Sequence, residues 1–113
     1  MMAMPKYSAQ RDANERAILD AITAAGGTYI QLSDTRKAGI PDLCVGIDGE
    51  TYLIEVKKRG GNLNPEQQWW AQVWKGGAVR VIHGPREFLV MIGRLKPWAK
   101  GDAASKGVKG APG

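Results

Sequence analysis

Two acids and a lysine interrupt the most apolar stretch of the sequence, residues 39–60, "GIPDLCVGIDGETYLIEVKKRG". Asp42 precedes one apolar run, Glu55 and Lys57 end a second, and an Asp-Gly turn at 48–49 separates the two runs. Pairing about such a turn places residues whose numbers sum to about 97 opposite each other, so Asp42 falls near Glu55. Because side chains alternate along a strand, Glu55 and Lys57 share one face. We therefore expect two carboxylates and one ammonium group to meet on a hairpin.

Such a cluster suits hydrolysis of a phosphodiester with the help of a metal ion. Two neighbouring carboxylates repel each other, and Mg²⁺ or Mn²⁺ between them relieves the repulsion. Mg²⁺ takes one or two carboxylates and keeps several waters, and the backbone carbonyl of Val56 could add an oxygen ligand. Lys57 could orient or deprotonate an attacking water, or neutralise charge that develops on a phosphate. The number of metal ions, one or two, stays open.

A third carboxylate lies on the first expected helix. Glu15 continues the apolar stripe of Ile18, Leu19 and Ile22 by helical spacing, so it should face the core. A surface acid paired with Arg11 or Arg16 is the alternative interpretation.

The elements that must position these groups follow from the hydrophobic pattern. We expect a helix from an N-cap at Ser8 to Gly26, strands at 28–33, 42–47 and 51–56, a helix at 65–75, a strand at 78–83, and a short helix from Pro85. The order α-β-β-β-α-β-α predicts the α/β class, with a mixed four-stranded sheet flanked by helices. The fourth strand should run parallel to the third because a helix connects them.

Two segments resemble a known family of nucleases. Residues 39–42, Gly-Ile-Pro-Asp, followed by Glu55-Val56-Lys57, resemble the PD-(D/E)XK nuclease motif. Residues 60–70, "GGNLNPEQQWW", resemble the VRR-NUC branch of that superfamily, and the resemblance covers about residues 8–83. It implies a restriction-endonuclease-like core. It also implies a small homodimer similar to Holliday junction resolvases, because standalone members of the branch have this form.

The resemblance also implies roles for single residues. Asp42 and Glu55 would be metal ligands, and Lys57 would be the catalytic lysine. Glu15 would be the acid of the first helix, with a place in the active site and at the metal. A glutamine of the second helix would complete the site. Either Gln67 or Gln68 could be that residue, and the spacing from the family leucine favours Gln67.

Basic side chains flank the strand ends that carry the acids. Arg36, Lys37, Lys58 and Arg59 are expected to contact DNA phosphates, with solvated loops as the alternative. The net charge of +5 supports a polyanionic partner, although the last residues contribute much of it. We expect a single nuclease domain at 1–96 and a disordered basic Gly/Ala/Lys tail at 97–113.

The remaining aromatic and titratable residues receive structural interpretations. Trp70 and Trp74 are four residues apart and should pack the second helix on the sheet, whereas Trp69 should project elsewhere. His83 stands alone at a strand end without metal-ligand spacing, so we interpret it as structural. Cys44 lies in an apolar strand and is interpreted as an inert core thiol.

Composition excludes some classes of protein and leaves three functions open. The sequence holds no apolar run of about 18 residues, so no membrane partner is expected. A single cysteine excludes an internal disulfide and suits a reducing cytoplasm, in a bacterium or a phage host. The leading hypothesis is a divalent-metal-dependent DNA endonuclease, specific for branched DNA and acting in repair, recombination or phage DNA processing. The alternatives are a non-catalytic DNA-binding module, an RNA-cleaving nuclease, and a scaffold whose Trp-rich helix recruits a partner.

Overall fold

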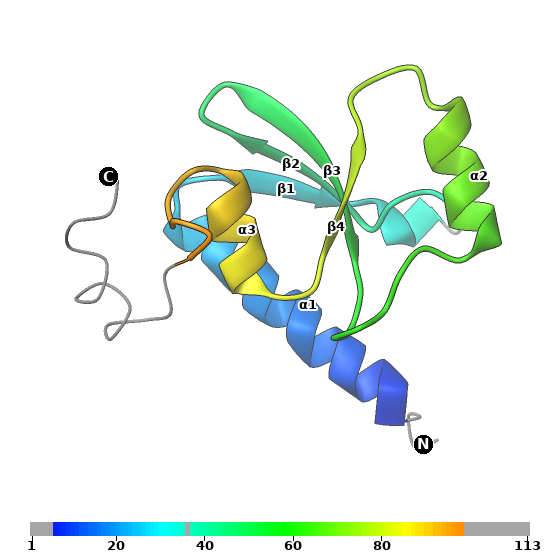
Figure 1. Ribbon diagram of the computed structural model, residues 1–113, viewed down its shortest axis with the longest axis horizontal. Helices are drawn as coiled ribbons and strands as arrows, with labels where there is room; N and C mark the ends of the chain where they lie inside the picture. The colour runs from blue at the N-terminus through cyan, green and yellow to red at the C-terminus, as the bar shows by residue number, and fades with distance from the viewer. Residues whose placement is uncertain (1–5, 36, 99–113) are drawn as a thin grey trace.

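A computed structural model describes residues 6–35 and 37–98, with side chains for 13–33 and 37–98 (Figure 1). The elements in chain order are α1 (Lys6–Ala24), β1 (Thr28–Gln31), the 3₁₀ helix η1 (Leu32–Thr35), β2 (Leu43–Ile47), β3 (Glu50–Val56), α2 (Pro65–Val73), β4 (Val79–Ile82) and α3 (Pro85–Met91). The first helix begins at Lys6, so the expected N-cap at Ser8 is wrong, and η1 was not expected. Arg36 and residues 99–113 of the expected tail lie outside the described residues.

The four strands form one mixed sheet in the order β1-β2-β3-β4. β1 and β3 each run antiparallel to β2, and β4 runs parallel to β3, as the helical connection predicts. Leu43 pairs with Ile54 and Ile47 with Glu50, so the partner numbers sum to 97 as expected. The turn at 48–49 has positive φ at both residues, 54° and 79°, the geometry of a two-residue hairpin loop. The predicted hairpin register and α/β class are confirmed.

The core lies between one face of the sheet and the helices α1 and α3, which run beside each other (Figure 1). Its buried apolar side chains are Ile18, Ile22, Leu43, Val45, Ile47, Ile54, Val56, Ile82 and Phe88. α1 ends where Gly26 adopts a φ of +92° and the Gly27 N–H donates to the Ile22 carbonyl over 2.9 Å. No helix within the described residues is long and apolar enough to cross a membrane.

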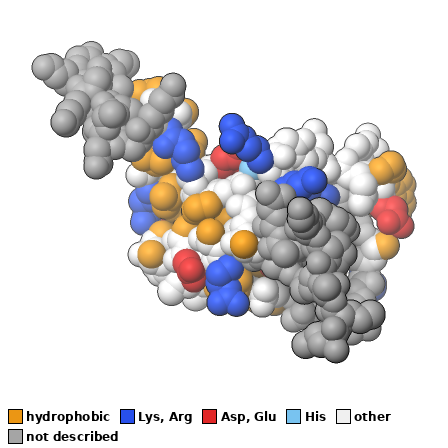
Figure 2. All heavy atoms as spheres, turned by 90° about the horizontal axis from the view of Figure 1, so that it is seen from below, with side chains coloured by type: hydrophobic (Ala, Val, Ile, Leu, Met, Phe, Trp, Pro, Cys, Tyr) orange, Lys and Arg blue, Asp and Glu red, His pale blue; other side chains and the backbone are white. Residues whose placement is uncertain are grey.

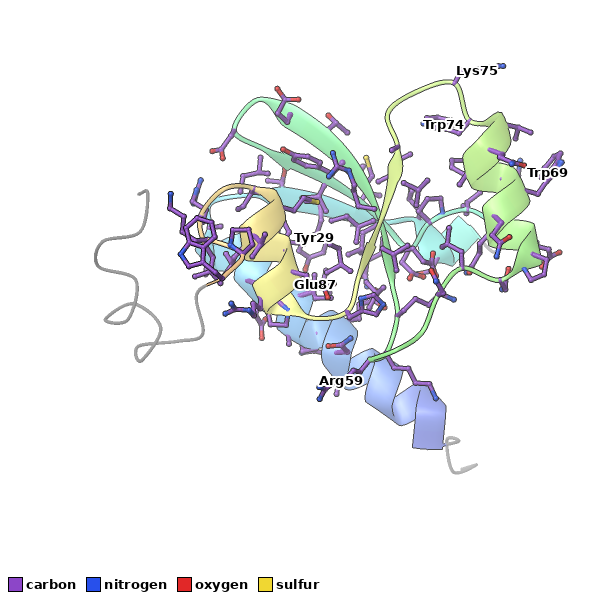
Figure 3. All side chains as sticks on the ribbon, in the orientation of Figure 1. Tyr29, Arg59, Trp69, Trp74, Lys75 and Glu87 are labelled. Atoms are coloured by element: carbon purple, nitrogen blue, oxygen red, sulfur yellow. The ribbon has the colours of Figure 1, made fainter. Side chains whose placement is uncertain are left out.

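The opposite face of the sheet is only partly covered. Every residue of α2 is described, and none is buried. Trp70 and Trp74 stack on each other with ring centroids 4.8 Å apart, so the expectation that both pack on the sheet holds only in part. Trp74 lines a cavity over Leu53 and Cys44, and Trp69 projects into solvent with 64% exposure (Figure 3). Cys44 is half-buried on this face, outside the core.

Candidate active site

Asp42 is held at the start of β2 by main-chain groups of two other elements. Its carbonyl accepts hydrogen bonds from the N–H groups of Leu32, at 2.7 Å, and Ser33, at 3.3 Å, both in η1. Its Oδ2 atom accepts a hydrogen bond of 2.8 Å from the N–H of Val56. Only 7% of the residue is exposed. The backbone of Asp42 is therefore fixed to η1 and its carboxylate to β3.

Glu55 lies on the same face of the sheet as Asp42. Leu43 and Val56 point into the core, and strand alternation turns their neighbours Asp42 and Glu55 to the other face. Continuing the ladder by one residue beyond the Leu43–Ile54 pair places Asp42 opposite Glu55. Glu55 is 3% exposed, and such a buried carboxylate needs partners to offset its desolvation.

Gln67 and Lys57 supply partners for this carboxylate. The Gln67 Nε2 atom donates to Oε2 of Glu55 over 2.9 Å, and the Lys57 Nζ atom lies 3.7 Å from the same oxygen. Gln67 also closes the cap of α2, because its Oε1 atom accepts from the Asn64 N–H over 2.9 Å. Gln68 donates instead to the carbonyl of Leu63 over 2.9 Å. The structure thus brings Gln67, and not Gln68, to the acid.

The backbone of Lys57 is fastened to β4 and to α1. Its N–H donates to the carbonyl of Ile82 over 3.1 Å, and its carbonyl accepts a 2.9 Å hydrogen bond from Nδ2 of Asn14. The same amide donates to the carbonyl of His83 over 2.6 Å. Asn14 therefore ties the ends of β3 and β4 to α1. Asn14 was not predicted from the sequence, where its only signal is that it precedes Glu15.

Glu15 is buried, as its place on the apolar stripe predicts, but it approaches the sheet from the α1 side. Its Oε2 atom accepts a 3.3 Å hydrogen bond from Nε2 of Gln31, and the residue is 7% exposed. It lines a polar cavity of about 450 Å³ together with Arg16, Tyr29 and Ser33. A place for Glu15 among the metal ligands stays a prediction.

The donor set suits a hard cation only in combination with other oxygens. Within residues 13–33 and 37–98, no three His, Cys, Asp or Glu side chains cluster so that they could hold a metal ion. Asp42 and Glu55 offer two carboxylates, the number that Mg²⁺ typically takes, and the Val56 carbonyl is a further hard oxygen. Water and a substrate phosphate would have to complete such a site.

Three of the predicted DNA-binding residues have described side chains. Lys37, Lys58 and Arg59 are exposed. Lys58 and Arg59 line a cavity of about 370 Å³ with Ala13, Asn14 and Ala17 of α1 and with His83.

His83 is bonded on both sides of its ring. Nε2 lies 2.7 Å from the Gly61 carbonyl and Nδ1 lies 2.9 Å from Oε1 of Glu87. The hydrogen bond to Gly61, and then the bond to Glu87, raise the pKa of His83 above its ordinary 6.5.

Comparison with known proteins identifies the fold. No protein-family model matches the sequence, and no curated protein matches it significantly. The elements and their order define an α/β domain with a mixed four-stranded sheet flanked by helices. The chain is similar to a solved VRR_NUC domain with a TM-score of 0.63 and 21% sequence identity, over 76% of this chain and 98% of that one. The resemblance inferred from the sequence is therefore confirmed at the level of the fold.

Proposed function

We propose that the chain is a divalent-metal-dependent DNA endonuclease of the VRR-NUC branch. One observation carries the proposal: Asp42 is fixed to β3, while Gln67 and Lys57 converge on the buried carboxylate of Glu55. A surface with no function would not need two buried acids beside a lysine at adjacent strand ends, since burying charge costs stability.

Each residue has a distinct part in the proposed reaction. Asp42 and Glu55, with the Val56 carbonyl, would hold Mg²⁺ or Mn²⁺. When bound, such an ion polarises a phosphoryl oxygen and makes a bound water more acidic. Gln67 fixes the orientation of the Glu55 carboxylate through its 2.9 Å hydrogen bond. The ammonium group of Lys57 neutralises charge that develops on the phosphate or orients the attacking water.

DNA that departs from a plain duplex is the proposed substrate. Lys58, Arg59, Lys37 and Arg36 would contact phosphates, which position a nucleic acid without reading its sequence. A domain of this size, with no separate recognition element among the described residues, is suited to read shape. Branched intermediates of repair, recombination or phage DNA processing, in the cytoplasm, fit that requirement. Asp42, Glu55 and Lys57 are all present, which favours an enzyme over a DNA-binding module that has lost its chemistry.

A homodimer is part of the proposal. The face of the sheet opposite α1 exposes Ile30, at 64%, and Trp74, at 44%, next to the half-buried Leu53 and Cys44. A two-fold dimer would cover such apolar surface and present two sites to a branched substrate. A monomeric mass by light scattering at micromolar concentration would contradict it.

A cleavage panel tests the proposed function. Branched, nicked and linear DNA, and the same branched structure made of RNA, are incubated with the purified chain in Mg²⁺, Mn²⁺ or chelator. We expect cleavage of branched DNA with either metal and none with chelator. Cleavage with chelator would refute the metal chemistry, and cleavage of RNA alone would replace the proposed substrate.

A further inference from the structure

His83 is the single histidine of the chain, and both of its ring nitrogens face hydrogen-bond acceptors. Nε2 lies 2.7 Å from the carbonyl oxygen of Gly61, and Nδ1 lies 2.9 Å from Oε1 of Glu87. A carbonyl and a carboxylate can only accept, so the ring must donate both bonds. A neutral imidazole has one N–H, whereas the imidazolium has two. Both contacts can be hydrogen bonds at the same time only in the protonated form of His83.

These bonds anchor the far end of the basic loop, residues 58–61, that directly follows Lys57. The Gly61 N–H donates to the carbonyl of Lys58 over 2.8 Å, which closes the loop into a turn. Asn14 fixes the near end of the loop through the Lys57 carbonyl, and it also binds the carbonyl of His83. The side chains of Lys58 and Arg59 thus lie between two anchored points.

Charged groups of both signs surround the imidazole (Figure 2). Glu87 of α3 favours its protonation and also accepts the His83 backbone N–H over 2.8 Å. Lys58 and Arg59 line the same cavity as the ring. Among the α1 residues whose side chains the structure describes, 13–24, those that line this cavity are the neutral Ala13, Asn14 and Ala17. The hydrogen bonds to Gly61 and Glu87 outweigh the desolvation of the ring, so the pKa of His83 is raised.

We propose that His83 is a positioning residue, which as the imidazolium holds the basic loop in place and releases it on deprotonation. One consequence rests on the proposed function: Lys58 and Arg59 bind DNA phosphates more weakly as the pH rises. Loss of one hydrogen bond of ~1 kcal/mol changes the ratio of ordered to open loop about fivefold, so we expect a similar loss of DNA affinity.

The loop can be followed without any DNA. Because the chain has one histidine, NMR reports the titration of its ring without ambiguity. We expect a midpoint above 6.5, and we expect exchange of the Gly61 amide, corrected for intrinsic rates, to accelerate through the same midpoint. His83→Gln does not titrate, so its Gly61 exchange, corrected for intrinsic rates, should not change across this pH range. A midpoint at or below 6.5, or a Gly61 exchange rate that does not change as His83 titrates, would overturn the proposal.

Glu87→Gln separates positioning from a merely structural role. The amide keeps an acceptor for the ring but loses the charge, so the midpoint should fall while Gly61 protection at low pH remains. An unchanged midpoint would count against the proposed role of Glu87.

DNA binding is measured next, in chelator and at constant ionic strength. Wild-type affinity should fall about fivefold across the His83 titration and should be flat in His83→Gln. Lys75→Gln removes an exposed cation beyond α2, away from Arg59 and Glu87, and is the control for loss of charge (Figure 3). It should keep the pH dependence of the wild type. If Gly61 exchange follows the titration but no DNA binds, the positioning role is supported and the nuclease proposal is refuted.

Discussion

Replacing Gln67 by alanine should destabilise the domain far more than the same change at its neighbour Gln68. Gln67 makes two hydrogen bonds of 2.9 Å, one from the Asn64 N–H and one to the buried carboxylate of Glu55. The neutral bond contributes about 1 kcal/mol and the bond to a charged group about 1.5–3 kcal/mol. Gln67→Ala should therefore lower the free energy of unfolding by about 2.5–4 kcal/mol. The lower value corresponds to a fall in Tm of about 10–20 °C.

Gln68→Ala is the matched control for this prediction. Gln68 lies on the same turn of α2, is exposed and makes one side-chain bond, to the carbonyl of Leu63. Loss of this hydrogen bond should lower the free energy of unfolding by less than about 1 kcal/mol. Gln67→Glu keeps the acceptor for Asn64 but sets a carboxylate against Glu55, so it should be destabilised in chelator and recover with Mg²⁺. Urea denaturation in chelator measures all three variants. Equal losses for Gln67→Ala and Gln68→Ala would refute the assigned contact with Glu55.

Three further predictions concern stability and metal binding. The pKa of His83 is raised in the folded state, so protonated His83 stabilises the fold fully below pH 6.5, and this stabilisation is lost as the pH rises through the folded pKa. The urea midpoint of the wild type should fall over that range, and the midpoint of His83→Gln should not. Asn14→Ala removes the hydrogen bonds to the Lys57 and His83 carbonyls. Urea denaturation should show a free energy of unfolding lower by about 2 kcal/mol, and DNA cleavage should be slower. Asp42→Asn keeps an acceptor for the Val56 N–H, so stability should change by less than about 1 kcal/mol, but calorimetry should show loss of Mg²⁺ binding.

The part of the site that was predictable lies on the hairpin. A two-residue Asp-Gly loop fixes the register, and strand alternation then decides which side chains share a face. Asp42, Glu55 and Lys57 could therefore be brought together from the sequence. The cap at Asn64 and Pro65 likewise fixed where α2 starts, and with it the position of Gln67.

Contacts between distant segments could not be predicted in the same way. Asn14 reaches Lys57 across 43 residues and His83 across 69, and local periodicity carries no information at such separations. His83 was interpreted as structural because it has no metal-ligand spacing, although the carbonyl of Gly61 and the carboxylate of Glu87 complete its environment. The limited packing of α2 was missed because two tryptophans at helical spacing can stack on each other as well as on a sheet.

Single-turnover cleavage of branched DNA by Lys57→Ala tests the proposed chemistry most directly. The wild type and the variant are compared at saturating Mg²⁺ and saturating protein, with DNA binding measured separately in chelator. We expect the cleavage rate to fall at least about 100-fold, the effect of losing a group that stabilises developing charge. We expect DNA affinity to change little, because Lys58 and Arg59 remain. Cleavage by Lys57→Ala at the wild-type rate would contradict the role assigned to the lysine beside Glu55.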